Sequence, residues 1–470
     1  MATAEMQHRH ISYTRQLTTT MNGPPKAAEV LPATPILNKA IQRSCLRLMP
    51  FFLLMYLLSF LDRVNIGFAK ESMQLSTGIS DAEFAIGAGL LFLTYAALSS
   101  PSTIMMHKLG IKTWMSFLMI SWGLIAGSMM FVSGKTSYYV LRLLLGAAEA
   151  GFVPGVILYL TRWFPRKVRA QVIGIFYFGA PLAFIAGGPV SGFLLQFDGV
   201  KGLHGWQWMF LVEGGIAAGV GIWAYKYLDD RPVDAKWLPA MEKRALDAAL
   251  TLDTKESCVQ SISRLPKILG DRGFVQYTFA YFLVQMSILG ITFSLPSQVA
   301  HLLHTQVNVK VGFVSAIPWV CAIAASLSIP RLADRWNAHR IIGIIILTTS
   351  GISIGISAKG GPTLVLIALC FAIAGLISVQ PVMWTYPSRR LTGVAAAGGI
   401  GLINGIGLSG GFVAPIVKNF ADTISKNTGG GLYVLGFLTL IAAVCIFALK
   451  WPDDTQSIRL DGGAVDLTLV

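Results

Sequence analysis

The stretch TWMSFLMISWGLIAGSMMFV, residues 113–132, carries no charged side chain along its whole length. A helix of about 20 apolar residues crosses the hydrocarbon core of a bilayer. Similar runs recur along the chain, and only 13% of its 470 residues are charged, against roughly 25% in soluble domains. A transmembrane barrel would show short alternating segments instead. The sequence therefore predicts an all-α membrane protein.

We expect twelve transmembrane helices, and we place them by their apolar runs at residues 46–69, 82–105, 113–132, 137–160, 170–196, 207–228, 274–300, 311–330, 340–358, 363–386, 393–417 and 432–450. The loops between them sort by charge. Basic clusters such as RWFPRKVR (162–169) alternate with weakly charged loops such as SAKGGP (357–362). Because positive loops face the cytoplasm, both termini and the long loop 229–272 are predicted to be cytoplasmic.

That loop divides the chain into two groups of six helices. The halves share patterns at similar spacing: GGPVSG begins at Gly187 and GGFVAP at Gly410, while HKLGIK begins at His107 and DRWNAHR at Asp334. Two offsets that agree within four residues indicate a duplicated six-helix unit. In transporters built this way, the substrate site lies between the halves near the midplane. The predicted organisation is a cytosolic tail, an N-terminal bundle, a cytosolic loop, a C-terminal bundle and a second tail, at residues 1–45, 46–228, 229–272, 273–451 and 452–470.

Composition also excludes several classes of protein. A net charge of +14 would suggest nucleic acid in a soluble protein, but here the positive residues lie in short clusters between apolar runs. The five cysteines show no zinc-like spacing, and the spans contain no nucleophile–base pair or cofactor motif. We therefore expect no nucleic-acid partner, no metal, no cofactor and no enzymatic activity.

The run LSFLDRVNIGFAK (58–70) places charges inside an apolar segment. An ionisable residue within a membrane is costly and marks a functional site by default. Adjacent helical residues point about 100° apart, so Asp62 and Arg63 each need a partner elsewhere. The planar fork of arginine fits a carboxylate through two hydrogen bonds, which makes Arg63 a candidate anion ligand. The alternative is that both residues sit at the membrane boundary, paired with lipid headgroups or a loop.

Three further ions lie in the predicted spans. Arg142 and Glu149 are seven residues apart and so project from one helix face, with Gly146 among the small residues between them that allow close helix packing. A carboxyl group balanced between burial and a nearby arginine can take up and release a proton; the alternative is a static ion pair. Glu213 lies about a turn inside an interfacial tryptophan pair, where a structural partner is the better interpretation.

Uncharged polar side chains complete the candidates for a binding site. They are Tyr95, Gln285, Trp384, Thr385 and Asn404. An unpaired amide among apolar residues would be costly, so Asn404 should bond a helix or a substrate hydroxyl. For any one of them a packing role is the usual explanation, but they occur in both halves of the chain.

Several longer motifs resemble the anion:cation symporter family of major facilitator transporters. They are FLDRVNIGFA (60–69), LRLLLGAAEAGFVPG (141–155), RWFPRKVRA (162–170) and WQWMFLVEG (206–214). AEAGFVPG (148–155), FYFGAPLA (176–183) and VQPVMWTYP (379–387) are most similar to bacterial sugar-acid permeases, particularly those for rhamnonate, with tartrate permeases a near relative. The match runs from about Leu46 to Lys450.

The resemblance implies roles for single residues. Arg63 would hold the substrate carboxylate, Asp62 and Glu149 would carry protons, and Arg142 would pair with Glu149. Positions matching Tyr95, Trp384 and Asn404 line the sugar-acid site in relatives. Ala180 and Phe60 replace a glutamine and a tyrosine of some members, which favours a less hydroxylated substrate, such as a deoxy sugar acid, with Gln285 compensating from the other half.

The function this implies is import of a small organic anion, a sugar acid or related hydroxy acid, by proton symport with alternating access. The expected setting is the bacterial inner membrane, with the protein as a monomer in lipid. A sodium-coupled or facilitative carrier, an antiporter, and a non-transporting membrane anion sensor remain open alternatives.

Overall fold

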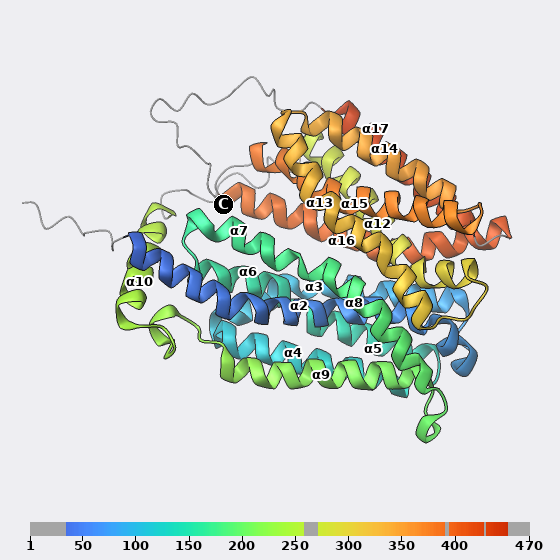
Figure 1. Cartoon of the computed structure of the whole chain (residues 1–470), viewed down its shortest axis with the longest axis horizontal. Helices are drawn as coiled ribbons and strands as arrows, with labels where there is room; N and C mark the ends of the chain where they lie inside the picture. The colour runs from blue at the N-terminus through green and yellow to red at the C-terminus, as the bar shows by residue number, and fades with distance from the viewer. Residues whose placement is uncertain (1–33, 258–270, 391–393, 427–428, 450–470) are drawn as a thin grey trace, which may run out of the picture.

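The computed structural model describes residues 34–257, 271–390, 394–426 and 429–449, and within them every regular element is a helix. Eleven helical segments of this part are long and apolar enough to cross a membrane. A further long helix, α16 (Val394–Ser425), lies among them at the position of the eleventh predicted span (Figure 1). The prediction of an all-α membrane protein with twelve long helices is confirmed.

The helices form two halves, one above the other in Figure 1. The N half contains α2 (Thr34–Thr77), α3 (Asp81–Leu109), α4 (Ile111–Ser128), α5 (Lys135–Glu149), α6 (Phe152–Trp163), α7 (Arg166–Tyr177), α8 (Gly179–Leu194) and α9 (Gly205–Tyr227). The C half contains α12 (Arg272–Leu302), α13 (Val309–Arg335), α14 (His339–Ser357), α15 (Pro362–Arg390), α16 and α17 (Gly430–Ala448). Between them along the chain comes α10 (Ala240–Ser257).

Helix packing repeats between the halves. In the N half α2 packs against α8, α3 against α5 and α4 against α9. The corresponding pairs of the C half are α12 with α16, α13 with α15, and α14 with α17. The internal duplication predicted from two short motifs is therefore present in the packing of the whole chain.

The two halves meet along three helix pairs, α2 with α12, α3 with α16 and α8 with α13. Glycines allow the backbones to touch: a Cβ added at Gly188 would lie 2.7 Å from the carbonyl oxygen of Gly312, and one at Gly89 would lie 2.7 Å from that of Phe412. These contacts lie toward one end of the molecule, which carries the connections 78–80, 195–204 and 303–308; we call it the sealed end. The opposite end, with α10 and the start of α2, is the linker end.

Spans four and five, each placed by a single apolar run, are interrupted in the structure. The fourth breaks at Ala150–Gly151, between α5 and α6, and the fifth at Phe178, between α7 and α8. Each break precedes a proline, Pro154 or Pro181, by less than one turn. A proline lacks the N–H that would bond the preceding turn, so it is tolerated in the first turn of a new helix.

Part of the predicted loop 229–272 is ordered against the N half. Arg43 of α2 pairs with Glu242 of α10 at 3.5 Å, and the guanidinium of Arg47 lies 4.6 Å from the ring of Tyr227 and 4.9 Å from that of Trp237. The first helix also begins at Thr34, twelve residues before the predicted start. The segments 1–33, 258–270 and 452–470, which include most of both predicted tails, lie outside the described residues.

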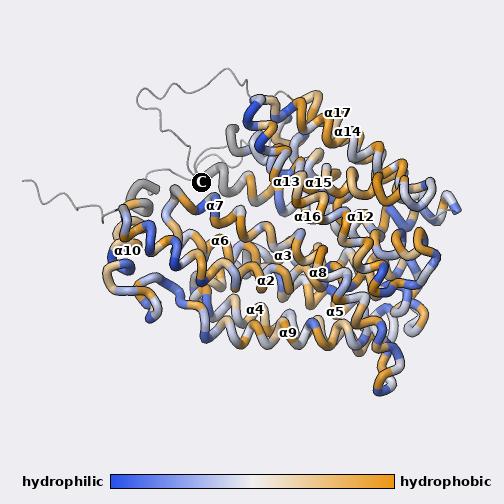
Figure 2. Tube along the Cα trace, viewed as in Figure 1, coloured by the Kyte–Doolittle hydropathy of each residue, from blue (hydrophilic) through white to orange (hydrophobic). Residues whose placement is uncertain are grey.

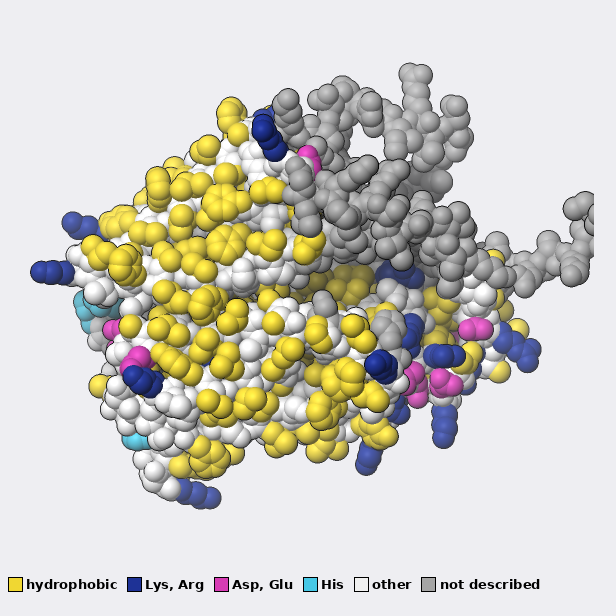
Figure 3. Space-filling model, turned by 180° about the vertical axis from the view of Figure 1, so that it is seen from behind, with side chains coloured by type: hydrophobic (Ala, Val, Ile, Leu, Met, Phe, Trp, Pro, Cys, Tyr) yellow, Lys and Arg dark blue, Asp and Glu magenta, His cyan; other side chains and the backbone are white. Residues whose placement is uncertain are grey.

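The surface fits a bilayer. Figure 2 shows apolar residues along the length of the helices, and Figure 3 shows apolar side chains over the middle of the molecule with the Lys, Arg, Asp and Glu side chains gathered at its two ends. Large side chains such as Phe371 and Phe437 are more than half exposed in the isolated chain. Toward the linker end, the view of Figure 3 is hollowed between the two halves.

Candidate functional site

An ion pair lies buried at the centre of the N half. Arg63 Nη2 of α2 is 3.2 Å from Oε2 of Glu149, the last residue of α5. Both side chains are buried. The guanidinium carbon of Arg63 lies 4.5, 5.7 and 5.5 Å from the ring centres of Phe60, Phe92 and Tyr95. Aromatic faces attract a cation, so these rings and Glu149 hold the guanidinium in place away from lipid.

The prediction that Arg142 pairs with Glu149 is wrong in this conformation. Arg142 is fully buried, and it donates through Nε to the carbonyl of Gly87 at 3.3 Å and through Nη2 to that of Ala88 at 3.0 Å. Arg142 and Glu149 share one face of the helix, but seven residues separate them by about 10 Å along its axis. Arg142 therefore fastens α5 to α3, while Arg63 takes the carboxylate.

Gly146 confirms the close packing expected around this pair. A Cβ added there would lie 2.1 Å from the carbonyl oxygen of Leu91, so only glycine lets α5 approach α3 at this level. The approach brings the Arg142 guanidinium within reach of α3 carbonyls.

Asp62 is also buried, and its Oδ2 has no hydrogen-bond partner. In the part of the chain that the structure describes, it makes no ion pair, with Arg63 or any other residue. It interacts electrostatically with Glu149, Glu213, Arg142 and Arg63. Asp62 thus belongs to a buried cluster of charged groups, but its carboxyl makes no hydrogen bond or ion pair within the described residues.

Glu213 has the structural partner that the sequence predicted. Its Oε2 accepts a 2.5 Å hydrogen bond from Nδ2 of Asn65, and Oδ1 of Asn65 accepts one of 2.8 Å from Ser191. These bonds tie α9, α2 and α8 together. Asn65 lies in the same run as Asp62 and Arg63, but residue spacing along the chain does not predict its pairing with Glu213.

The candidates in the C half lie on surfaces that face the N half. Leu289 and Phe92, from opposite halves, both border Gly411 of α16. Gln285 lies one turn before Leu289 on α12, and Asn404 two turns before Gly411, so both share those faces nearer the linker end. There the halves diverge: Asn404 is exposed, and Oε1 of Gln285 is buried without a partner.

Trp384 and Thr385 follow on α15. The ring of Trp384 is 5.0 Å from that of Tyr281, which places it beside the same α12 face. The hydroxyl of Thr385 instead donates to the carbonyl of Val382 at 2.7 Å within its own helix. Its hydrogen is therefore already used, which weakens Thr385 as a donor to a ligand.

Sequence reasoning missed three tyrosines near the charge cluster. Tyr56 and Tyr177 of the N half have ring centres 6.1 Å apart, and both lie near Tyr281 of the C half. Tyr177 is 46% exposed although it lies within a predicted span. A tyrosine is unremarkable inside an apolar run, because its ring packs as a hydrophobe, so no signal in the sequence separated these three from core residues.

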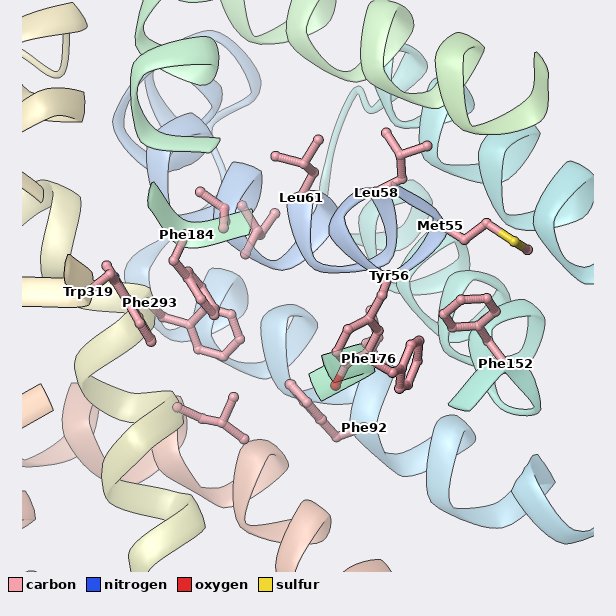
Figure 4. Close-up of a cluster of buried hydrophobic side chains, with 14 of the residues drawn as sticks. Met55, Tyr56, Leu58, Leu61, Phe92, Phe152, Phe176, Phe184, Phe293 and Trp319 are labelled. Carbon is pink, nitrogen blue, oxygen red and sulfur yellow. The ribbon is translucent and has the colours of Figure 1, made fainter. Parts of the chain in front are cut away.

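Aromatic side chains close the space toward the sealed end. Phe184 stacks on Trp319 across the two halves, with ring centres 3.8 Å apart and planes 7° apart, and Phe92 meets Phe293 at 6.1 Å (Figure 4). In the same view Tyr56 packs on Phe176. The Phe184–Trp319 and Phe92–Phe293 contacts close the space toward the sealed end, whereas Tyr56, two turns before Arg63 on α2, lies toward the linker end. Within the described residues, no group of three or more His, Cys, Asp or Glu could hold a metal ion.

Comparison with known proteins places this arrangement in a family. A model of the Major Facilitator Superfamily matches residues 52–415. The chain is 40% identical over 418 residues to the inner membrane transport protein RhmT of Escherichia coli (strain K12), covering 89% of this chain and 97% of that protein. It is 37% identical over 415 residues to a putative tartrate transporter of Agrobacterium vitis, covering 88% and 95%.

A solved structure has the same fold. It is a bacterial homologue of the human lysosomal transporter Spinster, in an inward-facing and unoccupied conformation, with a TM-score of 0.70 and 14% identity, covering 88% of this chain and 97% of that one. The two six-helix halves, the matching family model and the full-length relatives agree. The chain belongs to the major facilitator superfamily, and it is a multi-pass membrane transporter rather than an enzyme.

Proposed function

We propose that this protein imports a small organic monocarboxylate, a sugar acid or related hydroxy acid, together with protons by alternating access. The observation that carries the proposal is the buried Arg63–Glu149 ion pair. A guanidinium kept in the interior of a transporter, and held there by a carboxylate of the protein itself, is a ready site for the carboxylate of a substrate.

In this scheme Glu149 and the substrate compete for Arg63. When Glu149 takes up a proton, it loses its charge and its hold on the guanidinium. The freed Arg63 then accepts the substrate carboxylate through two hydrogen bonds. When the proton leaves, Glu149 pairs with Arg63 again and displaces the substrate, so binding of the anion requires the proton.

Asp62 is the second proposed proton carrier. Its carboxyl has no hydrogen-bond partner at Oδ2 and interacts electrostatically with Glu149. Protonation of one of the two carboxyls therefore changes the proton affinity of the other. Arg142, bonded to two carbonyls of α3, fixes the positive charge that both carboxyls face. Its proposed role is positioning rather than contact with substrate.

The remainder of the substrate would lie between the halves. Tyr95 lies beside Arg63, while Gln285, Trp384 and Asn404 offer hydrogen bonds and an aromatic face from the C half, with Thr385 a weaker candidate for the reason given above. The relatives' names, a tartrate transporter among them, support a small hydroxylated acid. Phe60 and Ala180 present no polar group to it, which favours a substrate with a deoxygenated carbon.

The proposed setting is the bacterial inner membrane, with the linker end and both termini in the cytoplasm. The basic clusters of the sequence lie on loops at the linker end, as the preference of positive loops for the cytoplasm requires. With the halves in contact at the sealed end, the structure would then be inward-open. We propose a monomer surrounded by lipid.

Uptake into proteoliposomes tests the proposal. Purified protein should take up a labelled sugar acid faster when the outside is made acidic, and Arg63→Ala should abolish the uptake. Sodium replacement and preloading with unlabelled acid distinguish a sodium-coupled carrier and an antiporter. Uptake that ignores the proton gradient would overturn the proton coupling, and ligand binding without flux would point to a sensor.

A further inference from the structure

Five ionisable groups are buried in the N half, and their charges would not balance if all were ionised. The carboxyls are Asp62, Glu149 and Glu213, and the guanidiniums are those of Arg63 and Arg142; all are buried. If every group were ionised, one negative charge would remain uncompensated inside the apolar part of the molecule, which is strongly unfavourable. The cluster is neutral only when one of its three carboxyls carries a proton.

Glu213 is the carboxyl without a cation. Glu149 has Arg63, and Asp62, although it makes no ion pair within the described residues, interacts electrostatically with both arginines as well as with the two other acids. Glu213 has a single amide hydrogen bond, from Asn65, and its Oε1 is buried without a partner. A protonated carboxyl needs no counter-charge, and one oxygen can still accept from Asn65.

The helices around Glu213 supply no positive charge. On α4 the facing residues are Gly123 and Gly127, which lie against Gly214, and the one charged residue of α4, Lys112, is at the opposite end of that helix. The residues of α8 include no ionisable side chain, and its Ser191 donates to Asn65 rather than to Glu213. From α2 the facing groups are Asn65 and Asp62. Within the described residues of these helices, the charged group nearest to Asn65 on its own face of α2 is Asp62, one turn away and itself an acid.

We propose that Glu213 is held as the neutral acid in this conformation and forms, with Asp62, a carboxyl pair that shares one proton. The inference rests on the proton-coupled transport proposed above and adds a third carboxyl to it. In the exchange, the O–H bond of Glu213 breaks and one forms on Asp62, so the total charge of the pair is unchanged. Glu213 lies on the sealed-end side of Asp62, beside Asn65, and so stands between Asp62 and the solution that the sealed end faces.

A purely structural role for Glu213 is the competing explanation, and glutamine separates the two. In Glu213→Gln the amide still bonds Asn65, so the connection of α9 to α2 survives. Glutamine also resembles the protonated acid but cannot release a proton. A structural role therefore predicts no change, whereas the proton-sharing role predicts a defect confined to steps in which the pair loses its proton.

The experiment compares two transport modes in proteoliposomes. We expect Glu213→Gln to reduce net uptake driven by a proton gradient by about tenfold, which is less than the usual effect of removing a positioned proton-transfer group from an enzyme. Exchange of internal for external substrate should stay within about twofold of the rate of the parent protein. The matched control is Glu71→Gln, an exposed glutamate on the same side of the molecule. Net uptake equal to that of the parent protein would overturn the inference and leave proton symport intact.

Infrared difference spectra of the purified protein give a readout that does not depend on transport. At neutral pH the parent protein should show the carbonyl stretch of a protonated carboxylic acid, and Glu213→Gln should lose it while Glu71→Gln keeps it. If the parent protein ignores a proton gradient, the proposed symport fails, yet the spectrum still decides whether Glu213 holds a proton. A spectrum unchanged by Glu213→Gln contradicts the inference directly.

Discussion

The Arg63–Glu149 pair makes a prediction about stability that separates its two members. Arg63→Ala leaves a carboxylate buried without its cation, and breaking a buried pair in this way costs about 3–5 kcal/mol. Glu149→Gln in the same chain removes the orphaned charge. We therefore expect Arg63→Ala to lower the thermal unfolding temperature sharply and the double variant to recover most of the loss, although neither transports.

Thermal unfolding in detergent, followed by tryptophan fluorescence, measures this effect. Lys70→Ala is the control, because its partner Asp81 is well exposed and a surface pair contributes little. If the double variant is no more stable than Arg63→Ala, the carboxylate of Glu149 is not what the arginine neutralises.

Glu149 also makes a prediction about coupling. Glu149→Gln resembles the protonated acid, so Arg63 is permanently free to accept a substrate. We expect substrate binding to persist from pH 5 to pH 8 in this variant, whereas binding by the parent protein should weaken as the pH rises and Glu149 recovers its charge. Titration of ligand binding by fluorescence at several pH values checks this; a parallel pH dependence in both proteins would contradict it.

The ions were visible in the sequence, but their partners were not. A charge inside an apolar run stands out without any knowledge of the fold, which is why Asp62, Arg63, Arg142 and Glu149 could be identified. Which arginine reaches Glu149 depends on how closely α2 and α3 approach α5. Residue spacing along one helix gives no information about these distances between helices. Tyr56 and Tyr177 are the opposite case. A tyrosine inside an apolar run looks like a packed core residue, so the sequence did not mark either one as part of a site.

At the scale of the helix, the glycine contacts between α8 and α13 predict a shift in conformation. A Cβ at Gly312 would lie 2.3 Å from the carbonyl oxygen of Gly188, and the contact is between two backbones that cannot move aside independently. Gly312→Val should therefore force the halves apart at the sealed end and favour the opposite conformation. Gly219→Val is the matched control, since a Cβ there meets nothing within 4 Å.

Reaction of a cysteine placed at Asn404 with an impermeant thiol reagent reports the shift, in a chain whose own cysteines are replaced. In the present conformation position 404 is exposed toward the linker end, and Gly312→Val should slow its labelling from that side by at least about fivefold, the effect of roughly 1 kcal/mol. Unchanged labelling would mean that the sealed end tolerates the added side chain.

The elements themselves were predicted well where they are apolar and less well elsewhere. Long apolar runs placed the spans because a bilayer sets their length. The breaks before Pro154 and Pro181 were not predicted, since a proline inside a membrane helix can also be accommodated by a kink. The ordered start of loop 229–272 depends on tertiary contacts of Arg47 and Trp237, and such contacts cannot be inferred from a polar stretch of sequence.

At the scale of the whole molecule, the repeat of helix pairs explains why two short motifs were enough to predict the internal duplication. A duplicated bundle must reproduce its packing, so α2 with α8 and α12 with α16 are the same pairing seen twice. The halves differ in what they bury. Every buried Asp, Glu or Arg within the described membrane spans belongs to the N half. In the proposed function, charge handling would thus belong to the N half, while the C half would contribute hydrogen bonds to the substrate.

That division predicts the response of the whole transporter to voltage. If Asp62 and Glu149 each bring a proton with one monocarboxylate, a net positive charge enters per cycle, and a potential of 100 mV, negative inside, contributes about 2.3 kcal/mol, or about 50-fold in accumulation. A potassium diffusion potential across proteoliposomes, without a pH difference, should then drive uptake of a labelled sugar acid. Asp62→Asn should transport without this response, because a single proton moving with a monocarboxylate carries no net charge. Uptake indifferent to the potential in the parent protein would mean that a single proton accompanies the anion, and that one of these two buried acids keeps its protonation state throughout the cycle.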